Sequence, residues 1–421
     1  MASTNITRIA GRRVWDSRGR PTVEAEITLA GGATGRAIAP AGASRGMHEA
    51  IDLRDGGEDL GGFGVETALD NLADEIAPRL DGMDASDQEA VDLAMIDLDD
   101  TNTKSKLGGN TMIAVSMAVL HAAAAAENIP LWRYLAGDAD VRIPMPEIQI
   151  FGGGAHAGRR VDIQDFMAVP VGADSFDDAM EMIAEVYLAA GRLMADAGKL
   201  GGVADEGGWW PEFDTNEEAL DMLVRAIEAA DLTPGDDVAI SLDIAASEFG
   251  RNGLYTLGLE KRELDGDGMV DLLSGWIDRY PIVSIEDPLG EDDPEPFRAF
   301  TEQFGETVQI IGDDFLVTNA ERIANAADAG ICNSALIKPN QAGTVTETKA
   351  ALEAARKAGW ATVVSARSGE TEDITIAHLA VGWNAGQLKV GSFARSERMA
   401  KWNEILRIEE ALGDKARLAG T

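Results

Sequence analysis

The chain has 421 residues, of which 45% are hydrophobic, and its 36 basic and 73 acidic residues give a formal net charge of −37. This length and composition allow one small and one large domain, each with its own core. The acidic surplus repels polyanions, so neither nucleic acid nor an anionic membrane is expected as a partner.

The first third of the chain predicts a mixed α+β domain. Residues 5–38 alternate apolar and polar positions, and TVEAEITLAGG followed by ATGRAIAP indicates a hairpin that turns at Gly31 and Gly32. From residue 64 to 137 the pattern becomes helical, with apolar residues at helical spacing in DLAMIDLDDT and TMIAVSMAVLHAAAAAENIPLWRYLAG. We therefore expect an N-terminal α+β capping domain over residues 1–138.

From residue 141 onward, short apolar runs alternate with amphipathic helices, and many of the runs end in a polar residue. The runs are IPMPEIQIF, DFMAVPV, VAISLDIAA, IVSIEDP, VQIIGDD, ALIKPN, ATVVSAR and LKVGS. Helical segments between them include AMEMIAEVYLAAGRLMADAG and NEEALDMLVRAIEAA. This alternation predicts a (β/α) barrel over residues 139–421, with its chemistry at the carboxyl ends of the strands. A doubly wound open sheet is the alternative, but no G-x-G-x-x-G motif opens a helix.

Segment composition and cysteine usage indicate a cytoplasmic protein. The segment MASTNITRIAGRRVW lacks the apolar core of a signal peptide. No stretch approaches the run of about 20 apolar residues that spans a bilayer. Cys332 is the single cysteine, which excludes an intrachain disulfide and fits a reducing compartment. In its apolar context, Cys332 is expected to pack as a small core residue.

Three carboxylates close successive apolar runs: Asp243 in SLDIAA, Glu286 in SIEDP and Asp313 in IIGDDF. Each alone would be explained as a loop acid or a helix cap. Because strand ends converge in a barrel, the three together would repel one another unless a hard dication neutralised them. Mg²⁺ prefers such oxygen ligands. The pattern therefore predicts a magnesium site.

Two lysines follow in the same register, Lys338 in ALIKPNQ and Lys389 in GQLKVGS. A lysine that closes a buried strand is costly unless it is paired or functional. Beside a bound metal, the pKa of such a lysine is expected to fall, which would let it take a proton from carbon next to a carboxylate. The alternative is a lysine that extends its ammonium group to solvent.

Further polar side chains lie in glycine-rich loops. VADEGGWWPEF carries Glu206, and GGGAHAGRRVDIQDFM carries His156, Gln164 and Asp165. Carboxylates opposite the lysines could protonate a departing hydroxide. VVSARSGETED places a cation and a hydroxyl side by side as an anion cradle, formed by Arg367 and Ser368. The loop APAGASRGMHEAIDLRDGG, residues 39–57, could fold over the site as a lid.

Taken in order, these segments resemble the enolase family of Mg²⁺-dependent hydro-lyases nearly end to end. The motifs are VWDSRGRPTVE, GASRGMHEAIDLRDGG, ADEGG, DIAASEF, SIEDP, GDDFLVTN, IKPNQAGTVTET, RSGETEDITIAHLAVG and ARSERMAKWNEILRIEEAL. The resemblance implies an α/β fold with an eight-stranded, (β/α)8-type enolase barrel, an N-terminal cap and one irregular antiparallel strand early in the barrel. It also implies a homodimer or higher homo-oligomer, with the DSRG segment near the partner.

The resemblance implies specific roles for the residues above. Two Mg²⁺ ions would bind in each site, one held by Asp243, Glu286 and Asp313 and the other contacted by Ser44. The remaining roles are Lys338 as the base, Glu206 as the aid to hydroxide departure, Asp165 and His156 as further catalytic groups, and Lys389, Arg367, Ser368 and Gln164 as substrate ligands. The substrate would be a small anionic phospho- or phosphono-carboxylate.

The chain departs from the family pattern at several positions near the anion end of the site. Ala366 replaces His, Arg45 replaces Thr and Asp165 replaces Glu. Loss of an imidazole makes room and a guanidinium adds charge, so Arg45 and Ala366 are expected to line the substrate pocket. Added room and charge suggest a substrate larger and more anionic than 2-phosphoglycerate. The prediction is reversible dehydration of 2-phosphoglycerate to phosphoenolpyruvate, or the same reaction on a close, more anionic analogue. A reaction like that of carboxyphosphonoenolpyruvate synthase in phosphonate biosynthesis is the alternative, and a non-catalytic enolase-like binding protein is a further one.

Overall fold

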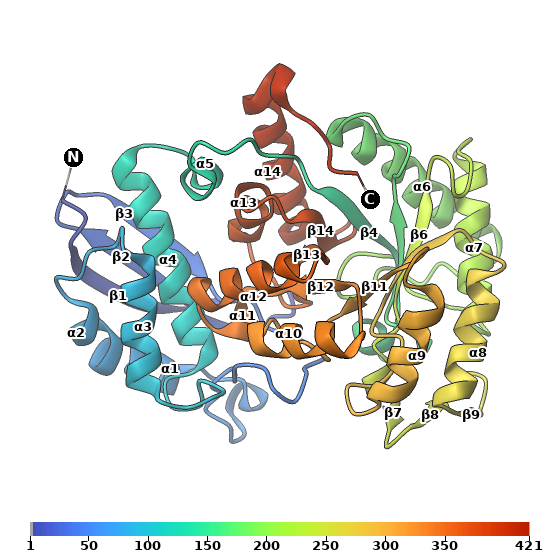
Figure 1. Ribbon diagram of the computed structural model, residues 1–421, viewed down its shortest axis with the longest axis horizontal. Coiled ribbons are helices and arrows are strands. Elements are labelled where there is room, and N and C mark those ends of the chain that lie inside the picture. The colour runs from blue at the N-terminus through green and yellow to red at the C-terminus, as the bar shows by residue number, and fades with distance from the viewer. Residues whose placement is uncertain (1–2, 421) are drawn as a thin grey trace.

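The computed structural model describes residues 3–420. A sheet with covering helices lies on one side of the molecule and a closed barrel lies on the other (Figure 1). The first part contains β1 (Ile6–Trp15), β2 (Pro21–Leu29), β3 (Thr34–Ile38), α1 (Glu66–Asn71), α2 (Ala77–Leu80), α3 (Gln88–Asp99), α4 (Gly109–Glu127) and α5 (Leu131–Ala136).

The three N-terminal strands form an antiparallel sheet in the order β1-β2-β3. The predicted hairpin between β2 and β3 is confirmed. Its turn contains Gly32 at φ +90°, a conformation that glycine adopts without strain. The sheet packs directly on α4 at Gly35. The two backbones are so close there that a Cβ on Gly35 would lie 2.2 Å from the Ala118 carbonyl oxygen. Glycine at this position therefore sets the close approach of helix and sheet.

Helix α4 is the central helix of the N-terminal part. It is long and apolar enough to cross a membrane, which corrects the expectation that no segment is. However, 83% of that apolar window is buried inside the structure, as expected for a core helix. The helical pattern predicted over residues 111–137 is also interrupted. Asn128 adopts a left-handed conformation and Pro130 follows, so the chain restarts as α5.

The eight apolar runs form the strands of one closed barrel. The strands are β4 (Met145–Gly152), β5 (Asp165–Val169), β6 (Ala239–Asp243), β10 (Ile282–Glu286), β11 (Gln309–Gly312), β12 (Ser334–Ile337), β13 (Ala361–Ser365) and β14 (Gly386–Gly391). Around the ring the order is β10-β11-β12-β13-β14-β4-β5-β6. Strand β5 runs antiparallel to both neighbours, which confirms the irregular strand implied by the resemblance. Asp243 lies opposite both Asp165 and Glu286 in the register, so strand pairing brings these carboxylates together.

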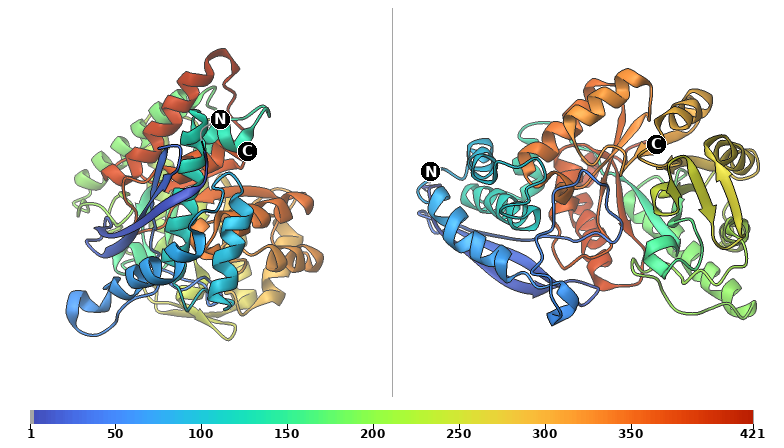
Figure 2. Two further views of the ribbon diagram at one scale, coloured as in Figure 1. Left: turned by 90° about the vertical axis from the view of Figure 1, so that its left-hand side faces the viewer. Right: turned by 90° about the horizontal axis from the view of Figure 1, so that it is seen from below.

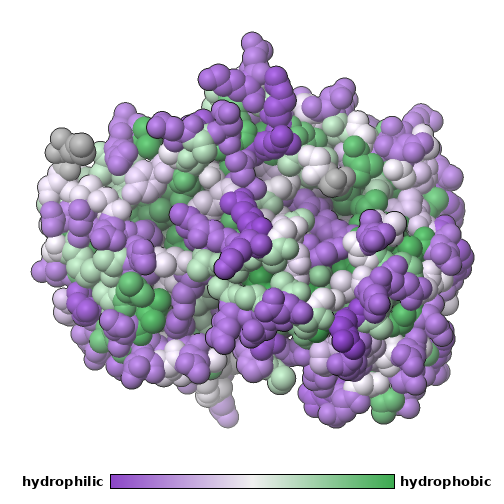
Figure 3. All heavy atoms as spheres, viewed as in Figure 1, coloured by the Kyte–Doolittle hydropathy of each residue, from purple (hydrophilic) through white to green (hydrophobic). Residues whose placement is uncertain are grey.

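Helices surround the barrel, which is seen from another direction in Figure 2. They are α6 (Phe176–Asp196), α7 (Asn216–Ala229), α8 (Gly266–Ile277), α9 (Pro294–Phe304), α10 (Ala320–Ala329), α11 (Pro339–Ala342), α12 (Val345–Lys357), α13 (Thr375–Gly382) and α14 (Ser396–Leu412). A small antiparallel sheet of β7 (Gly250–Arg251), β8 (Leu254–Leu257) and β9 (Arg262–Asp265) separates β6 from α8. This insertion was not predicted from the sequence. Hydrophilic residues dominate the face shown in Figure 3, as the acidic composition requires.

A buried carboxylate joins the N-terminal helices to the barrel. Asp92 of α3 is 0% exposed. Its carboxylate accepts hydrogen bonds from the Ser116 hydroxyl at 2.6 Å and from the backbone N–H of Thr346, at the start of α12, at 2.9 Å. Burial raises the pKa of Asp92 to about 6, although these hydrogen bonds oppose the shift.

This carboxylate is expected to make the joint pH-dependent. With a folded pKa of about 6 and an ordinary value of 3.8, Asp92 binds its proton more tightly in the folded protein. Its stabilising contribution is therefore fully present below pH 3.8 and is lost as the pH rises through 6. Between about pH 7.5 and pH 5, the wild type should gain roughly 1.4 kcal/mol of unfolding free energy relative to Asp92→Asn. Urea unfolding of both proteins at the two pH values measures this difference.

A surface carboxylate provides the control. Hydrogen bonds from Thr4 and Ser86 lower the pKa of Asp84, so Asp84→Asn should alter the pH dependence only at more acidic values. An Asp92→Asn difference that stays constant between these two pH values would contradict the assignment.

Candidate active site

A narrow cavity lies where the barrel strands end. Its volume is about 10 Å³, which is room for about one water molecule. Eleven of the residues predicted from the sequence line it: Ser44, His156, Gln164, Asp165, Glu206, Asp243, Lys338, Ala366, Arg367, Ser368 and Lys389. The barrel and the lid loop therefore bring together side chains that are up to 345 positions apart in the sequence (389 minus 44).

Lys389, on β14, lies among three buried carboxylates. Its Nζ is 2.8 Å from Asp243 Oδ2, 2.8 Å from Glu286 Oε2 and 3.4 Å from Asp165 Oδ2. Burial alone would lower the pKa of Lys389, but the surrounding carboxylates raise it well above its usual range. Burial and the neighbouring Asp243 raise the pKa of Glu286 well above its usual range, against the effect of Lys389. This part of the site thus holds more negative charge than one ammonium can balance.

Lys338 directly follows β12 and lies one strand away from Asp313, which follows β11. Its Nζ donates to Asp313 Oδ2, and the Gln341 amide donates to Asp313 Oδ1 at 2.8 Å. Burial lowers the pKa of Lys338, but Asp313 reverses the shift, so the pKa is raised. The direction is set by Asp313, because a neighbouring carboxylate stabilises the ammonium form of Lys338.

The three predicted metal ligands carry carboxylate oxygens, which are the donors that a hard cation prefers. In this structure these carboxylates contact Lys338 or Lys389. Among residues 3–420, Asp243, Glu286 and Asp313 do not form a group whose ligand atoms all lie within 4.8 Å of one another. Two other groups meet that distance: Asp287, Asp313 and Asp314, and His156, Asp165 and Glu206. Buried oxygens of Glu286, Asp165 and Gln164 have no hydrogen-bond partner within the described residues. Unpartnered buried oxygens of this kind fit a hard cation in their chemistry.

Asp287 is a site residue that sequence analysis missed, although it stands in the quoted SIEDP motif. Its carboxylate accepts from the backbone N–H groups of Asp313 at 2.9 Å and Asp314 at 2.7 Å. It therefore fixes the loop that presents the predicted metal ligand. Its position directly after Glu286 was the available signal.

A histidine and two carboxylates form the next group. His156 Nδ1 is 3.0 Å from Asp165 Oδ1, and His156 Nε2 is 3.7 Å from Glu206 Oε1. Burial lowers the pKa of His156, but the two carboxylates raise it to about 9. The imidazole is therefore protonated at neutral pH. Gln164 donates to Asp243 Oδ2 at 2.9 Å, which connects this group to the Lys389 cluster.

The predicted anion cradle is held under the lid loop. Arg367 Nη1 lies 2.9 Å from Glu49 Oε2, and Nη2 donates to the Ser44 carbonyl at 2.9 Å. Arg18 Nη1 donates to the Ser368 hydroxyl at 3.0 Å. Gly42 permits this closeness, because a Cβ there would lie 1.9 Å from Arg367 Nη2. Glu49 and Arg18 both occur in motifs quoted above, but sequence analysis gave them no role.

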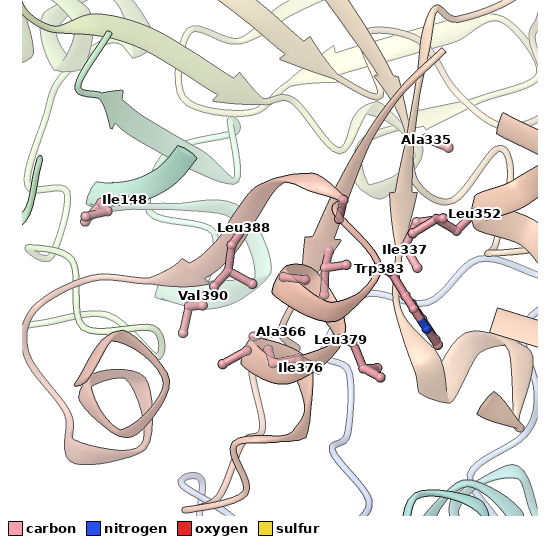
Figure 4. Close-up of a cluster of buried hydrophobic side chains, with 14 of the residues drawn as sticks. Ile148, Ala335, Ile337, Leu352, Ala366, Ile376, Leu379, Trp383, Leu388 and Val390 are labelled. Atoms are coloured by element: carbon pink, nitrogen blue, oxygen red, sulfur yellow. The ribbon is translucent and has the colours of Figure 1, made fainter. Parts of the chain in front are cut away.

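Two of the three departures from the family pattern, at positions 366 and 45, lie in different places. Ala366 lines the cavity and also belongs to a buried hydrophobic cluster with Ile376, Leu388 and Val390 (Figure 4). Arg45 is exposed and is not among the residues that line the cavity. Of the two substitutions, only the one at position 366 changes the cavity wall in this structure.

Known proteins match the chain over nearly its whole length. The family model for the N-terminal domain of enolase matches residues 6–135, and the model for the C-terminal TIM barrel domain of enolase matches residues 140–421. "Enolase 1" of Desulfitobacterium hafniense (strain Y51) is 50% identical over 420 residues, which cover 99% of this chain and 96% of that protein. The chain belongs to the enolase family of lyases.

Proposed function

We propose that the protein catalyses the reversible, Mg²⁺-dependent dehydration of 2-phosphoglycerate to phosphoenolpyruvate, or the same reaction on a close, more anionic analogue. One observation carries the proposal. In the ring of eight strands, β12 and β5 are four steps apart in either direction. Lys338, after β12, therefore faces Asp165 of β5 across the barrel, and Asp165 contacts His156, which lies beside Glu206. A base and an acid group on opposite sides of a substrate are what an elimination needs.

The residues divide the reaction between the two sides. Lys338 Nζ takes the proton from the α-carbon, and the electron pair left behind forms the carbon–carbon double bond. The β-hydroxyl leaves as water, aided by Glu206, with a proton from the pair that Glu206 forms with protonated His156. The protonated His156 beside Glu206 supplies positive charge on this side. Lys389 binds the substrate carboxylate, with Gln164 beside it.

The carboxylates are the proposed metal ligands, two Mg²⁺ ions binding in each site. Asp243, Glu286 and Asp313 would hold one ion and Ser44 would contribute to the other. When bound, Mg²⁺ supplies positive charge against the substrate carboxylate. Engagement of Asp313 elsewhere would also remove the partner that holds Lys338 in its protonated form. Lys338 could then act as a base.

Entry of substrate requires the lid to move. The cavity of about 10 Å³ is too small for a phosphorylated three-carbon acid. Arg367 and Ser368, the proposed phosphoryl ligands, are engaged by Glu49, the Ser44 carbonyl and Arg18. We propose that residues 39–57 open to admit the substrate, and that its phosphoryl group then takes over part of the Arg367 contacts.

A second candidate substrate carries an additional carboxylate, as in the reaction of carboxyphosphonoenolpyruvate synthase. The observation in its favour is Ala366, a small residue that lines the cavity beside Arg367 and Ser368. Arg45 adds no support, because it lies outside the cavity lining. The complete set of buried lysines and carboxylates favours either reaction over a non-catalytic binding role.

We also propose a domain boundary near residue 138, a cytoplasmic location and a homodimer or larger homo-oligomer. The boundary is supported by the change from the three-stranded sheet and α1–α5 to the barrel elements that begin with β4. The location is supported by Cys332, a single buried free cysteine. The oligomer is supported by Trp15, which is 52% exposed at the end of β1 beside the DSRG segment.

The test is dehydration of 2-phosphoglycerate by the purified protein with Mg²⁺, beside an enolase such as the Desulfitobacterium relative. We expect kcat/KM within about tenfold of the reference, which corresponds to roughly 1.4 kcal/mol of transition-state stabilisation. A loss of about a thousandfold or more, with Mg²⁺ still raising the melting temperature, would reject 2-phosphoglycerate as the substrate. The carboxyphosphono analogue should then be turned over faster. No turnover of either compound would reject the proposed function.

A further inference from the structure

Gln149 is a buried glutamine in β4 to which the proposed reaction gives no role. It is 1% exposed. Its Nε2 donates to Asp165 Oδ1, and its Oε1 accepts from the backbone N–H of Gly208 at 2.9 Å. Gly208 lies two residues after Glu206. One planar amide therefore connects the carboxylate of β5 to the loop that carries the proposed acid.

Two glycines make room for this amide. A Cβ at Gly208 would lie 2.5 Å from Gln149 Oε1, which is closer than real Cβ contacts come. A Cβ at Gly152 would lie 3.1 Å from both Oε1 and Nε2 of Gln149 and 2.6 Å from the Ala204 Cβ. The backbone around Gln149 is thus shaped to hold its full side chain, with the amide plane fixed by both of its ends.

Asp165 depends on this contact for its orientation. Oδ1 receives both the Gln149 amide and His156 Nδ1, while Oδ2 lies 3.4 Å from Lys389 Nζ. Asp165 is 0% exposed and its side chain is short, so the long side chain of Gln149 spans the distance between the two strands. A shorter partner at 149 would leave Oδ1 with His156 alone. Asp165 and His156 would then each lose part of the restraint on their orientation.

We propose that Gln149 is a positioning residue for the acid side of the reaction: it aligns Asp165 and His156, and through Gly208 it places the Glu206 loop. This inference rests on the proposed function. It predicts a selective defect. Lys338 lies across the ring from β5, and its ammonium is hydrogen-bonded to Asp313 and not to Gln149, so removal of the α-proton should survive when the departure of hydroxide is impaired.

The test compares Gln149→Asn, Asp165→Glu and the double variant. Asn is one methylene shorter than Gln and Glu is one methylene longer than Asp, so the double variant keeps the combined length of the two side chains. In Gln149→Asn, kcat for elimination should fall by about 10²-fold, the effect of misplacing a catalytic group by roughly 1 Å. Exchange of the substrate α-proton with solvent deuterium should fall less than about threefold, because Lys338 is untouched. The double variant should regain at least about tenfold in kcat over each single variant. A general structural role would lower exchange and elimination together and would show no such rescue.

Gln309→Asn is the matched control, because it shortens another barrel glutamine that is hydrogen-bonded to Gln387 and Ser334. It should leave the ratio of exchange to elimination unchanged. A double variant no faster than Gln149→Asn, or equal loss of exchange and elimination in Gln149→Asn, would overturn the inference. Inactivity of the wild type toward both proposed substrates would instead reject the proposed function. In that case the melting temperatures of the variants test the hydrogen bond between residues 149 and 165. A higher melting temperature in the double variant than in either single variant supports this contact, and no such recovery overturns it.

Discussion

Lys338→Ala is expected to abolish exchange of the α-proton of 2-phosphoglycerate with solvent deuterium and to lower kcat by about 10⁴-fold, the upper range for loss of a general base. Lys338 is buried at the end of β12, and its ammonium contacts Asp313. Alanine removes the amine that is proposed to take the proton. The measurement is the loss of the α-proton signal by NMR in deuterated buffer, alongside the rate of elimination.

Lys199→Ala is the control for loss of a lysine paired with two carboxylates. Lys199 Nζ lies 3.1 Å from Asp214 and 2.6 Å from Glu218, away from the cavity lining. This variant should keep both rates. Exchange that persists undiminished in Lys338→Ala would assign the base to another residue.

Glu286→Gln is expected to remove the stabilisation of the protein by Mg²⁺ and to lower kcat/KM by at least about 10³-fold, or roughly 4 kcal/mol. For the wild type, Mg²⁺ at 100 times its dissociation constant should add about 2.7 kcal/mol of stability. Burial raises the pKa of Glu286, so ionising this group opposes folding at neutral pH. The neutral amide should therefore not destabilise the metal-free protein through loss of that charge. The melting temperature with and without Mg²⁺, and after addition of a chelator, measures the effect.

Glu147→Gln is the matched control for this prediction. Glu147 is also buried in the barrel, where its carboxylate accepts from Ser241 and from Gln387, each at 3.0 Å. It is not among the cavity-lining residues. Its variant should keep the Mg²⁺ response. If Glu286→Gln is stabilised by Mg²⁺ as strongly as the wild type, Glu286 is not a ligand.

The strands were predictable because each barrel strand is a short apolar run that ends in a polar residue. Parallel strands end at one face of a barrel, so this pattern alone places four of the site residues at that face. They are Asp243, Glu286, Lys338 and Lys389. The hairpin between β2 and β3 was predictable for a similar local reason, because glycine relieves the strain of the turn.

Other features depend on contacts that a local pattern does not contain. Gln149 and Asp165 are 16 positions apart, and their hydrogen bond exists only because β4 pairs with β5. The direction of the Lys338 pKa depends on which way Asp313 turns. The outward position of Arg45 depends on the path of a loop. Neither the loop path nor the side-chain direction follows from hydrophobic periodicity.

The ion pairs of Lys389 also bear on synthesis of the protein. Its partners Asp243 and Glu286 precede it by 146 and 103 positions, so the ribosome completes both carboxylates long before it adds the ammonium that faces them. Burying these carboxylates without a cation is unfavourable, and β4 has no β14 to pair with until the last strand emerges. We therefore expect the barrel to close only after β14 is available, when the ammonium of Lys389 can offset the two carboxylates.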